Sequence, residues 1–124
     1  HPVSNCYVED VYHIWNECFR ILKKGGRLLA GFDNGLNFLF EDDHPLTVVN
    51  HLPFNPLKMS KERFEAMARN GEGIQFSHTM EEQIGGQLKA GFTLKALYED
   101  RDREGGSKIR EYAPQYMATL AVKP

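Results

Sequence analysis

The sequence predicts an α/β fold in which a helix leads directly into a buried strand. Residues 8–24 carry apolar side chains at steps of three and four positions, which places them on one helical face. Residues 27–32 form a short apolar run without alternation, as expected of a strand covered on both faces. Residues 92–98 and 116–122 predict two further strands. A helix that feeds a buried strand is typical of a parallel layer, and the long loop before residues 116–122 allows the last two strands to pair antiparallel.

The first helix carries signals at both ends. Glu9 and Asp10 occupy its first turn and Lys23 and Lys24 its last, where each charge suits the helix dipole. Gly25 supplies the left-handed position that ends a helix. We therefore expect a helix over residues 8–24 that turns at Gly25 into the strand.

Two shorter helices are predicted later in the chain. Ser60 is placed to cap a helix over residues 61–69. Thr79 and Glu82 form a capping box for a helix over residues 79–90. The Gly85-Gly86 pair weakens that helix and allows a close approach to a neighbour. Its apolar stripe is expected to consist of Met80, Ile84 and Leu88.

The remaining segments are loops of two kinds. Residues 33–56 hold many large apolar side chains among their turn residues, so we expect an ordered excursion rather than a flexible linker. Residues 100–108 are polar and charged and contain Gly105-Gly106, which predicts an exposed loop.

Composition excludes several classes of function. The 124 residues fit one domain, and 41% hydrophobic and 26% charged residues are typical of a soluble globular protein. The net charge of −2, with Lys and Arg scattered, offers no basic stripe for nucleic acid or an anionic membrane. Cys6 and Cys18, without a signal peptide or a long apolar span, indicate free thiols in the cytoplasm. A first residue His1 just before a helix predicts that residues 1–124 are the later part of a longer polypeptide.

Four stretches resemble the second half of class I S-adenosylmethionine-dependent methyltransferases, in particular the type 11 methyltransferase domain. His1-Pro2-Val3-Ser4-Asn5 resembles the segment after the family's fourth strand. The helix-to-strand joint, with Arg20-Ile21-Leu22-Lys23-Lys24-Gly25-Gly26-Arg27-Leu28-Leu29, resembles the "RVLKPGG-x-L" signature, with Lys24 at the usual proline. Leu88-Lys89-Ala90-Gly91-Phe92 resembles the "L-x-x-A-G-F" joint, and residues 113–123 resemble the closing strand.

The resemblance implies the C-terminal half of a Rossmann-like methyltransferase fold, with a parallel strand, an antiparallel final hairpin and flanking helices. It also implies a parent enzyme that transfers a methyl group from S-adenosylmethionine to a small-molecule acceptor. The family binds this cofactor through a Gly-rich turn after its first strand, and residues 1–124 contain no such motif. We therefore expect these residues alone to lack the cofactor-binding half and to be inactive.

Site candidates follow from the rule that ligands bind at the carboxyl ends of the strands. The resemblance puts Ser4 and Asn5 beside the cofactor or the acceptor, although both could simply start the helix. Tyr7 could border the same pocket or only pack beside the helix. Asp33 and Asn34 follow the buried strand and would face the substrate, while Asn34-Gly35 is more simply a turn.

The excursion supplies further candidates. Phe38 and Phe40 would help to cap a substrate pocket and exclude water, or else form the excursion's own small core. His44 and His51 are candidate general bases if the acceptor is a hydroxyl. The five histidines show no spacing of a metal site, so we expect no metal. Methyl transfer is an in-line displacement that proximity and orientation can drive without a metal.

Two rival functions remain at the level of sequence. One is a non-catalytic module that associates with itself through the edge of the central strand, which predicts a homodimer, with or without swapped elements. The other is a different Rossmann-like enzyme, such as a dehydrogenase, that shares the helix-to-strand joint by fold alone.

Overall fold

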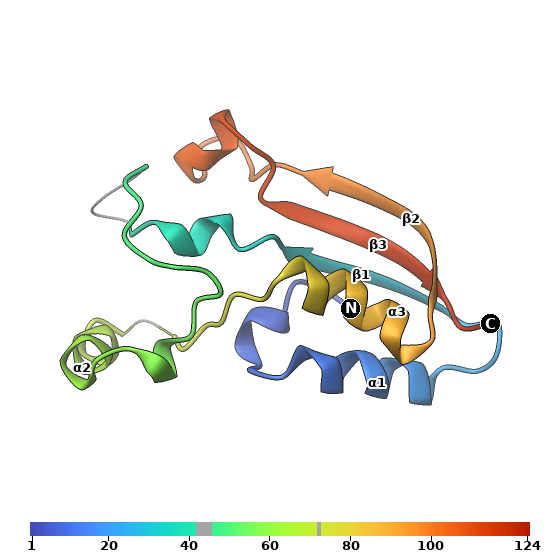
Figure 1. The fold of residues 1–124 in the computed structure, drawn as a ribbon. Coiled ribbons are helices and arrows are strands. Elements are labelled where there is room, and N and C mark those ends of the chain that lie inside the picture. The colour runs from blue at the N-terminus through green and yellow to red at the C-terminus, as the bar shows by residue number, and fades with distance from the viewer. Residues whose placement is uncertain (42–45, 72) are drawn as a thin grey trace.

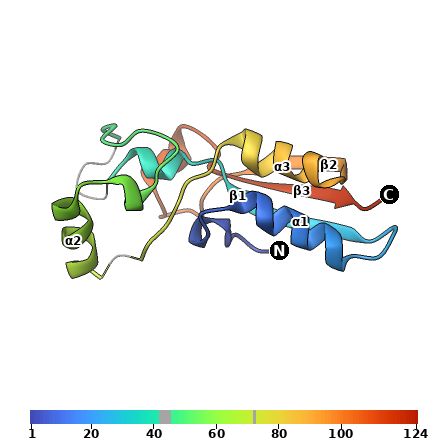
Figure 2. The same cartoon turned by 60° about the horizontal axis from the view of Figure 1, so that its bottom comes forward.

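A computed structural model describes residues 1–41, 46–71 and 73–124 of the chain. It contains a three-stranded sheet with α1 and α3 packed together on one face and α2 at a distance from them (Figure 1, Figure 2). The helices and strands are α1 (Val11–Ile21), β1 (Arg27–Asp33), α2 (Lys61–Arg69), α3 (Gly86–Ala90), β2 (Thr93–Asp100) and β3 (Tyr116–Val122). Short 3₁₀ turns lie at Asn5–Tyr7, Leu36–Leu39, Pro56–Lys58 and Lys108–Glu111, and a π-helical turn at Glu81–Gly85 precedes α3.

The sheet has the strand order β1-β3-β2, and β3 pairs antiparallel with both neighbours. The predicted antiparallel pairing of the last two strands is confirmed. The pairing of β3 with β1 places the end of the chain in the centre of the sheet, between two strands that precede it in sequence.

The parallel neighbour expected for β1 is present as a single residue, His1. The backbone nitrogen of His1 donates to the Leu29 carbonyl at 2.9 Å, and its own carbonyl accepts from the Gly31 nitrogen at 2.9 Å. One residue that bonds in this way to both neighbours of Ala30 has the pattern of a parallel ladder. The chain therefore enters the sheet beside β1 and in the same direction.

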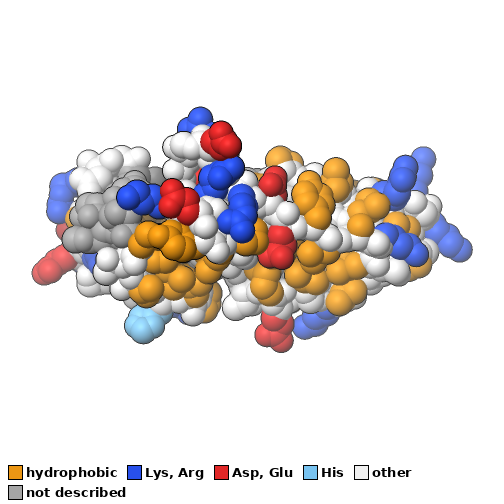
Figure 3. All heavy atoms as spheres, turned by 90° about the horizontal axis from the view of Figure 1, so that it is seen from above, with side chains coloured by type: hydrophobic (Ala, Val, Ile, Leu, Met, Phe, Trp, Pro, Cys, Tyr) orange, Lys and Arg blue, Asp and Glu red, His pale blue; other side chains and the backbone are white. Residues whose placement is uncertain are grey.

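The prediction that β1 is covered on both faces is wrong for the part of the chain that the structure describes. Leu28, Ala30 and Phe32 are buried against α1, whereas Leu29 between them is 62% exposed. The register of the sheet places Leu29 on the same face as Ala96, Tyr98, Ala118 and Leu120, which we call the open face. Figure 3 shows hydrophobic side chains gathered over the sheet in the view from above.

The first helix is shorter than predicted. It begins at Val11, because Asp10 is extended and its side chain accepts from the His13 nitrogen as an N-cap. It ends at Ile21, and Gly25 then takes the expected left-handed conformation with φ +81°. The last carbonyls of the helix are bonded not by Lys23 or Lys24 but by Lys123, whose Nζ donates to Phe19 O at 2.7 Å and Leu22 O at 2.9 Å.

The capping signals of the later helices are confirmed. Ser60 accepts from the Arg63 nitrogen at the start of α2, and the Thr79–Glu82 box forms in both directions. The predicted apolar stripe is partly wrong, because the buried face of this helix carries Gln83 and Gln87, and Leu88 at its border is 53% exposed.

The strict alternation predicted for residues 92–98 is also wrong. A β-bulge interrupts the pairing with β3 between Leu94 and Ala96. As a result Leu94 packs against the core while Ala96 and Tyr98 lie on the open face.

The core is centred on Trp15. Its indole is fully buried, packs edge-on against Phe32 and donates from Nε1 to the Glu82 carbonyl at 3.0 Å. Gly86 lies so close that a Cβ atom there would stand 2.6 Å from Trp15 Cδ1. Within the described ranges, no helix has the length and apolar character needed to span a bilayer.

Gly86→Ala is expected to lower the free energy of unfolding by about 1–3 kcal/mol, because a methyl group against the indole overpacks the core. Urea denaturation of the chain measures this change. Gly85→Ala is the matched control, since its Cβ would meet only Glu81 Cγ at 3.8 Å, and alanine favours a helix by about 0.5–1 kcal/mol over glycine. Equal destabilisation by both substitutions would contradict the proposed close contact.

Candidate functional site

A cavity of about 920 Å³ lies where the carboxyl end of β1 faces α2. The turn after His1 and the first residue of β3 complete the wall beside the sheet, and α2 with the segments around it forms the opposite wall. The lining residues are Val3, Cys6, Tyr7, Asp33, Asn37, Phe38, Phe40, Glu41, Asn50, Phe54, Met59, Arg63, Ala66, Met67, Asn70, Gly73, Gln75 and Tyr116.

Asp33 is the buried carboxylate of this cavity. It ends β1, is 6% exposed, and accepts from the Gly35 nitrogen through Oδ1 at 2.8 Å in a tight turn. Burial raises the pKa of Asp33, and the backbone hydrogen bonds and His78 offset this only in part. The side chain is therefore held in one place in a poorly hydrated position.

Tyr116 and Cys6 lie on the same wall. Tyr116, the first residue of β3, lies opposite Asp33 in the β1–β3 register, and its hydroxyl oxygen accepts from Asn37 Nδ2 at 3.5 Å. Burial raises the pKa of Tyr116, and the negative charges of Asp102 and Asp33 add to this rise. Burial likewise raises the pKa of the Cys6 thiol, so the thiol is not activated as a nucleophile.

Aromatic and methionine side chains form the apolar part of the cavity. Phe38 stacks on Phe54 with ring centroids 5.6 Å apart and an interplanar angle of 30°. Met59, just before α2, and Met67, within α2, line the cavity on the opposite wall. This surface suits a ligand with an apolar or aromatic body.

Among the described residues, a polar cluster centred on Arg63 joins the wall formed by α2 to the excursion. Arg63 Nη2 donates to Glu41 Oε1 at 2.9 Å and also to the side chain of Asn50. No side chain of α2 itself is buried. The position of this wall therefore depends on partly exposed contacts, which contribute little stability individually.

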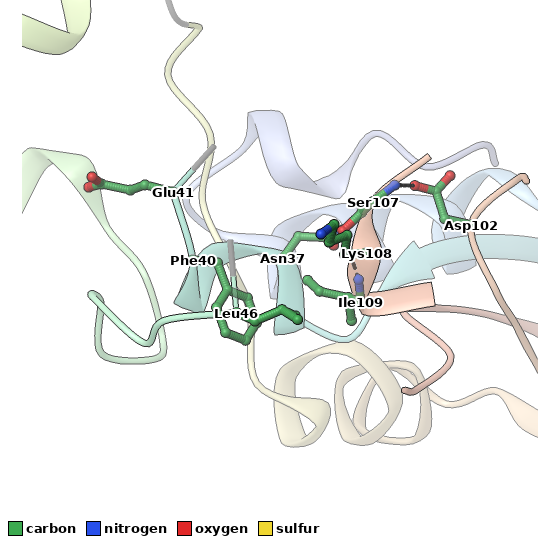
Figure 4. Close-up of a pocket in the computed structure, with 8 residues that line it drawn as sticks. All are labelled: Asn37, Phe40, Glu41, Leu46, Asp102, Ser107, Lys108 and Ile109. Atoms are coloured by element: carbon green, nitrogen blue, oxygen red, sulfur yellow. Dashed lines mark hydrogen bonds between the residues drawn. The ribbon is translucent and has the colours of Figure 1, made fainter. Parts of the chain in front are cut away.

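A smaller hollow of about 350 Å³ adjoins the cavity and shares Asn37, Phe40 and Glu41 with it. In Figure 4 the dashed lines show the Ser107 nitrogen donating to Asp102 and the Ile109 nitrogen donating to Ser107 Oγ. These bonds order the loop that follows β2, and that loop closes the hollow.

The structure brings four predicted site residues together in the large cavity, namely Tyr7, Asp33, Phe38 and Phe40. Tyr7 is 61% exposed at its rim. The roles of these four residues stay predictions. His51 is exposed and does not line the cavity, and His44 lies outside the described residues.

The side chains of Asn5 and Asn34 make hydrogen bonds to other parts of the chain. Asn5 is 2% exposed, and its side chain bonds to His1 Nε2 and Gln83 Oε1 at 2.7 Å each. Asn34 Nδ2 donates to the Pro114 carbonyl at 2.9 Å, and its Oδ1 accepts from the Leu36 nitrogen, which makes the turn favoured from the sequence. Ser4 Oγ donates to the Pro2 carbonyl at 3.1 Å.

Cys6, Asn37, Arg63 and Tyr116 also line the cavity, and the sequence did not predict them as site residues. Tyr116 could have been found, since a strand antiparallel to β1 that begins opposite Asp33 must place its first side chain at the same edge. Arg63 had no such signal, because helix periodicity does not show where an isolated helix packs. Across the described ranges, no cluster of three or more His, Cys, Asp or Glu residues could hold a metal ion.

The fold, a three-stranded sheet with helices on one face, is shared with methyltransferases of known structure. Two solved structures share it: a candidate S-adenosylmethionine-dependent methyltransferase from Listeria monocytogenes and an S-adenosylmethionine-dependent methyltransferase from Mesorhizobium loti. The first superposes with a TM-score of 0.65 at 18% identity, over 99% of this chain and 59% of that one. The second has a TM-score of 0.62 at 12% identity, over 98% of this chain and 58% of that one.

Sequence similarity agrees with the fold. The chain is 38% identical to the uncharacterized methyltransferase YbaJ of Bacillus subtilis over 128 aligned residues, which cover 99% of this chain and 49% of that protein. It thus spans about half the length of the curated relative that it matches. No family model matches it. The predicted resemblance to a methyltransferase is confirmed, and the coverage is consistent with the predicted C-terminal half.

Asp33→Asn is expected to stabilise the chain at neutral pH. A carboxyl whose folded-state pKa is raised contributes its full stability below its unfolded pKa and loses it as the pH rises through the folded value. Asparagine keeps the acceptor for Gly35 but carries no charge. The variant should therefore match the parent in acid and exceed its free energy of unfolding at pH 7, by about 1.4 kcal/mol for each tenfold rise in the proton affinity of Asp33 on folding.

Urea denaturation between acid and neutral pH measures this difference. A difference that stays constant across that range would show that the charge of Asp33 is not what destabilises the parent.

Proposed function

We propose that this chain forms the acceptor side of an active site that transfers a methyl group from S-adenosylmethionine to a small organic molecule. The observation that carries the proposal is the cavity at the carboxyl end of β1, in a fold shared with methyltransferases. Its volume of about 920 Å³ lies in the range of pockets that hold small molecules.

In this proposal the 124 residues do not form a nucleotide site by themselves. The Asn5 side chain is already bonded on both sides, and the Ser4 hydroxyl donates within its own turn. Both side chains therefore have structural partners, and their expected role beside the cofactor stays a prediction. The contacts to adenosine would come from the part of the polypeptide that the relatives have in addition to this stretch.

Within this proposal the chain binds and orients the acceptor. The stacked Phe38–Phe54 pair would hold its apolar body, and the α2 wall would exclude water from the reacting atoms. S-adenosylmethionine supplies an electrophilic methyl group, so alignment of the acceptor is the main task left for these residues. The predicted cytoplasmic location agrees with a soluble acceptor and stays a prediction.

Isothermal titration with S-adenosylhomocysteine tests the proposal. A polypeptide that carries these 124 residues together with the cofactor-binding half should release heat on binding, and the 124 residues alone should not. Titration with NADH serves as the control for a dehydrogenase. Heat with NADH, or no heat with S-adenosylhomocysteine in the longer polypeptide, would refute the proposal.

We further propose that the 124-residue chain on its own forms a homodimer, through the open face of the sheet instead of the strand edge expected from the sequence. Light scattering should give twice the chain mass of 14.2 kDa. Leu29→Gln should shift the chain toward the monomer, because Leu29 is 62% exposed on that face. Leu88→Gln is the matched control, since Leu88 is 53% exposed on α3 and should leave the dimer intact. A strictly monomeric parent would count against the dimer.

A further inference from the structure

We propose that Asp33 accepts the proton of the atom that becomes methylated, so that the acceptor is an apolar-bodied molecule whose nucleophile is a hydroxyl or an amine. This inference rests on the proposed function and assigns to Asp33 a role that the fold does not require. It departs from the sequence-based expectation, in which His44 or His51 served as the base.

The position of Asp33 is the first argument. Its Oδ1 is fixed by the Gly35 nitrogen at 2.8 Å, while the side chain lines the cavity and is 6% exposed. With Oδ1 held by the backbone, Oδ2 is the carboxylate oxygen that would accept from a ligand in the cavity. A carboxylate held in this way makes a hydrogen bond to a ligand without first losing freedom of rotation.

The surroundings of Asp33 are the second argument. Three titratable side chains interact electrostatically with Asp33. The charge of His78 lowers the pKa of Asp33, and the charge of Asp33 raises the pKa of Cys6 and Tyr116. None of the ion pairs recorded for the described residues includes Asp33, and Arg63 of the opposite wall pairs with Glu41. Because burial raises the pKa of Asp33, its carboxylate is a stronger base than an exposed one. A ligand hydroxyl or N–H group would be its natural partner.

The apolar wall is the third argument, and it defines the rest of the ligand. Val3 lies on the sheet side, Met59 and Met67 on the α2 side, and the Phe38–Phe54 stack between them. An aromatic or aliphatic body fits against this surface, while the single buried carboxylate selects for one proton donor.

The proposed methyl transfer needs only the acceptor, S-adenosylmethionine and water as reactants. The lone pair of the acceptor's oxygen or nitrogen forms the bond to the methyl carbon, and the carbon–sulfur bond breaks with its electron pair left on sulfur. The proton on the acceptor atom passes to Asp33 Oδ2 and from there to water. Asp33 is then a carboxylate again.

A pair of probes separates this role from simple apolar binding. Phenol carries the hydroxyl, and anisole presents the same ring with that proton replaced by a methyl group. Their dissociation constants are measured by NMR titration on the longer polypeptide saturated with S-adenosylhomocysteine. Phenol should bind about tenfold more tightly than anisole, as expected for a hydrogen bond to a charged group.

Asp33→Asn should reduce the phenol-to-anisole preference to near one, while unchanged β1 amide shifts confirm the fold. Asp100→Asn is the matched control, because Asp100 lies in the same row of the sheet at its exposed edge and should keep the preference. An equal affinity for both probes in the parent, a preference that survives in Asp33→Asn, or no binding of phenol would each overturn the role of Asp33. Binding of S-adenosylhomocysteine is measured in the same samples, so these failures are distinct from failure of the proposed function.

Discussion

The contact between Trp15 and Gly86 is the constraint on which the rest of the structure depends. It brings α1 within van der Waals distance of α3, which only a residue without a side chain at position 86 allows. The indole also binds the Glu82 carbonyl and packs on Phe32, so one side chain joins both helices to β1. Because both helices are fixed to the same face, the carboxyl end of β1 is left free to form the cavity wall.

A chain of buried polar contacts extends this constraint to the turn after His1. Asn5 bonds to Gln83, and Gln87 bonds both to the Gln83 carbonyl and to Thr119 of β3. His78 adds bonds of 2.9 Å to the carbonyls of Asn5 and Val8. A buried network of this kind specifies one arrangement, since a displaced member leaves its partner without a hydrogen bond. The turn that borders the cavity is thereby fixed by residues that do not line the cavity themselves.

Local signals in the sequence were sufficient to predict most helices and strands. The features that were not predicted depend on tertiary contacts. The caps at Ser60 and Thr79 and the strand at residues 116–122 depend on neighbouring residues alone, and they were predicted correctly. The bulge in β2 and the burial of Gln83 depend on pairing with β3 and on the polar network, which no local pattern shows. In the site, Asp33 could be predicted from its place at a strand end. Arg63 could not, because its partners lie in the excursion.

The two walls of the cavity differ in how firmly they are held, and this difference affects how a ligand would bind. Asp33 ends a strand in which Ala30 and Phe32 are fully buried, whereas α2 has no buried side chain and is joined to the excursion through Arg63. Partly exposed ion pairs contribute at most about 1 kcal/mol each. An apolar ligand would bury Met67 and its neighbours, and so supply part of the free energy that holds α2 in place. Under the proposals above, the position of α2 would be coupled to occupation by an apolar body, while Asp33 would contact the polar end of the ligand from its backbone-bonded position on β1.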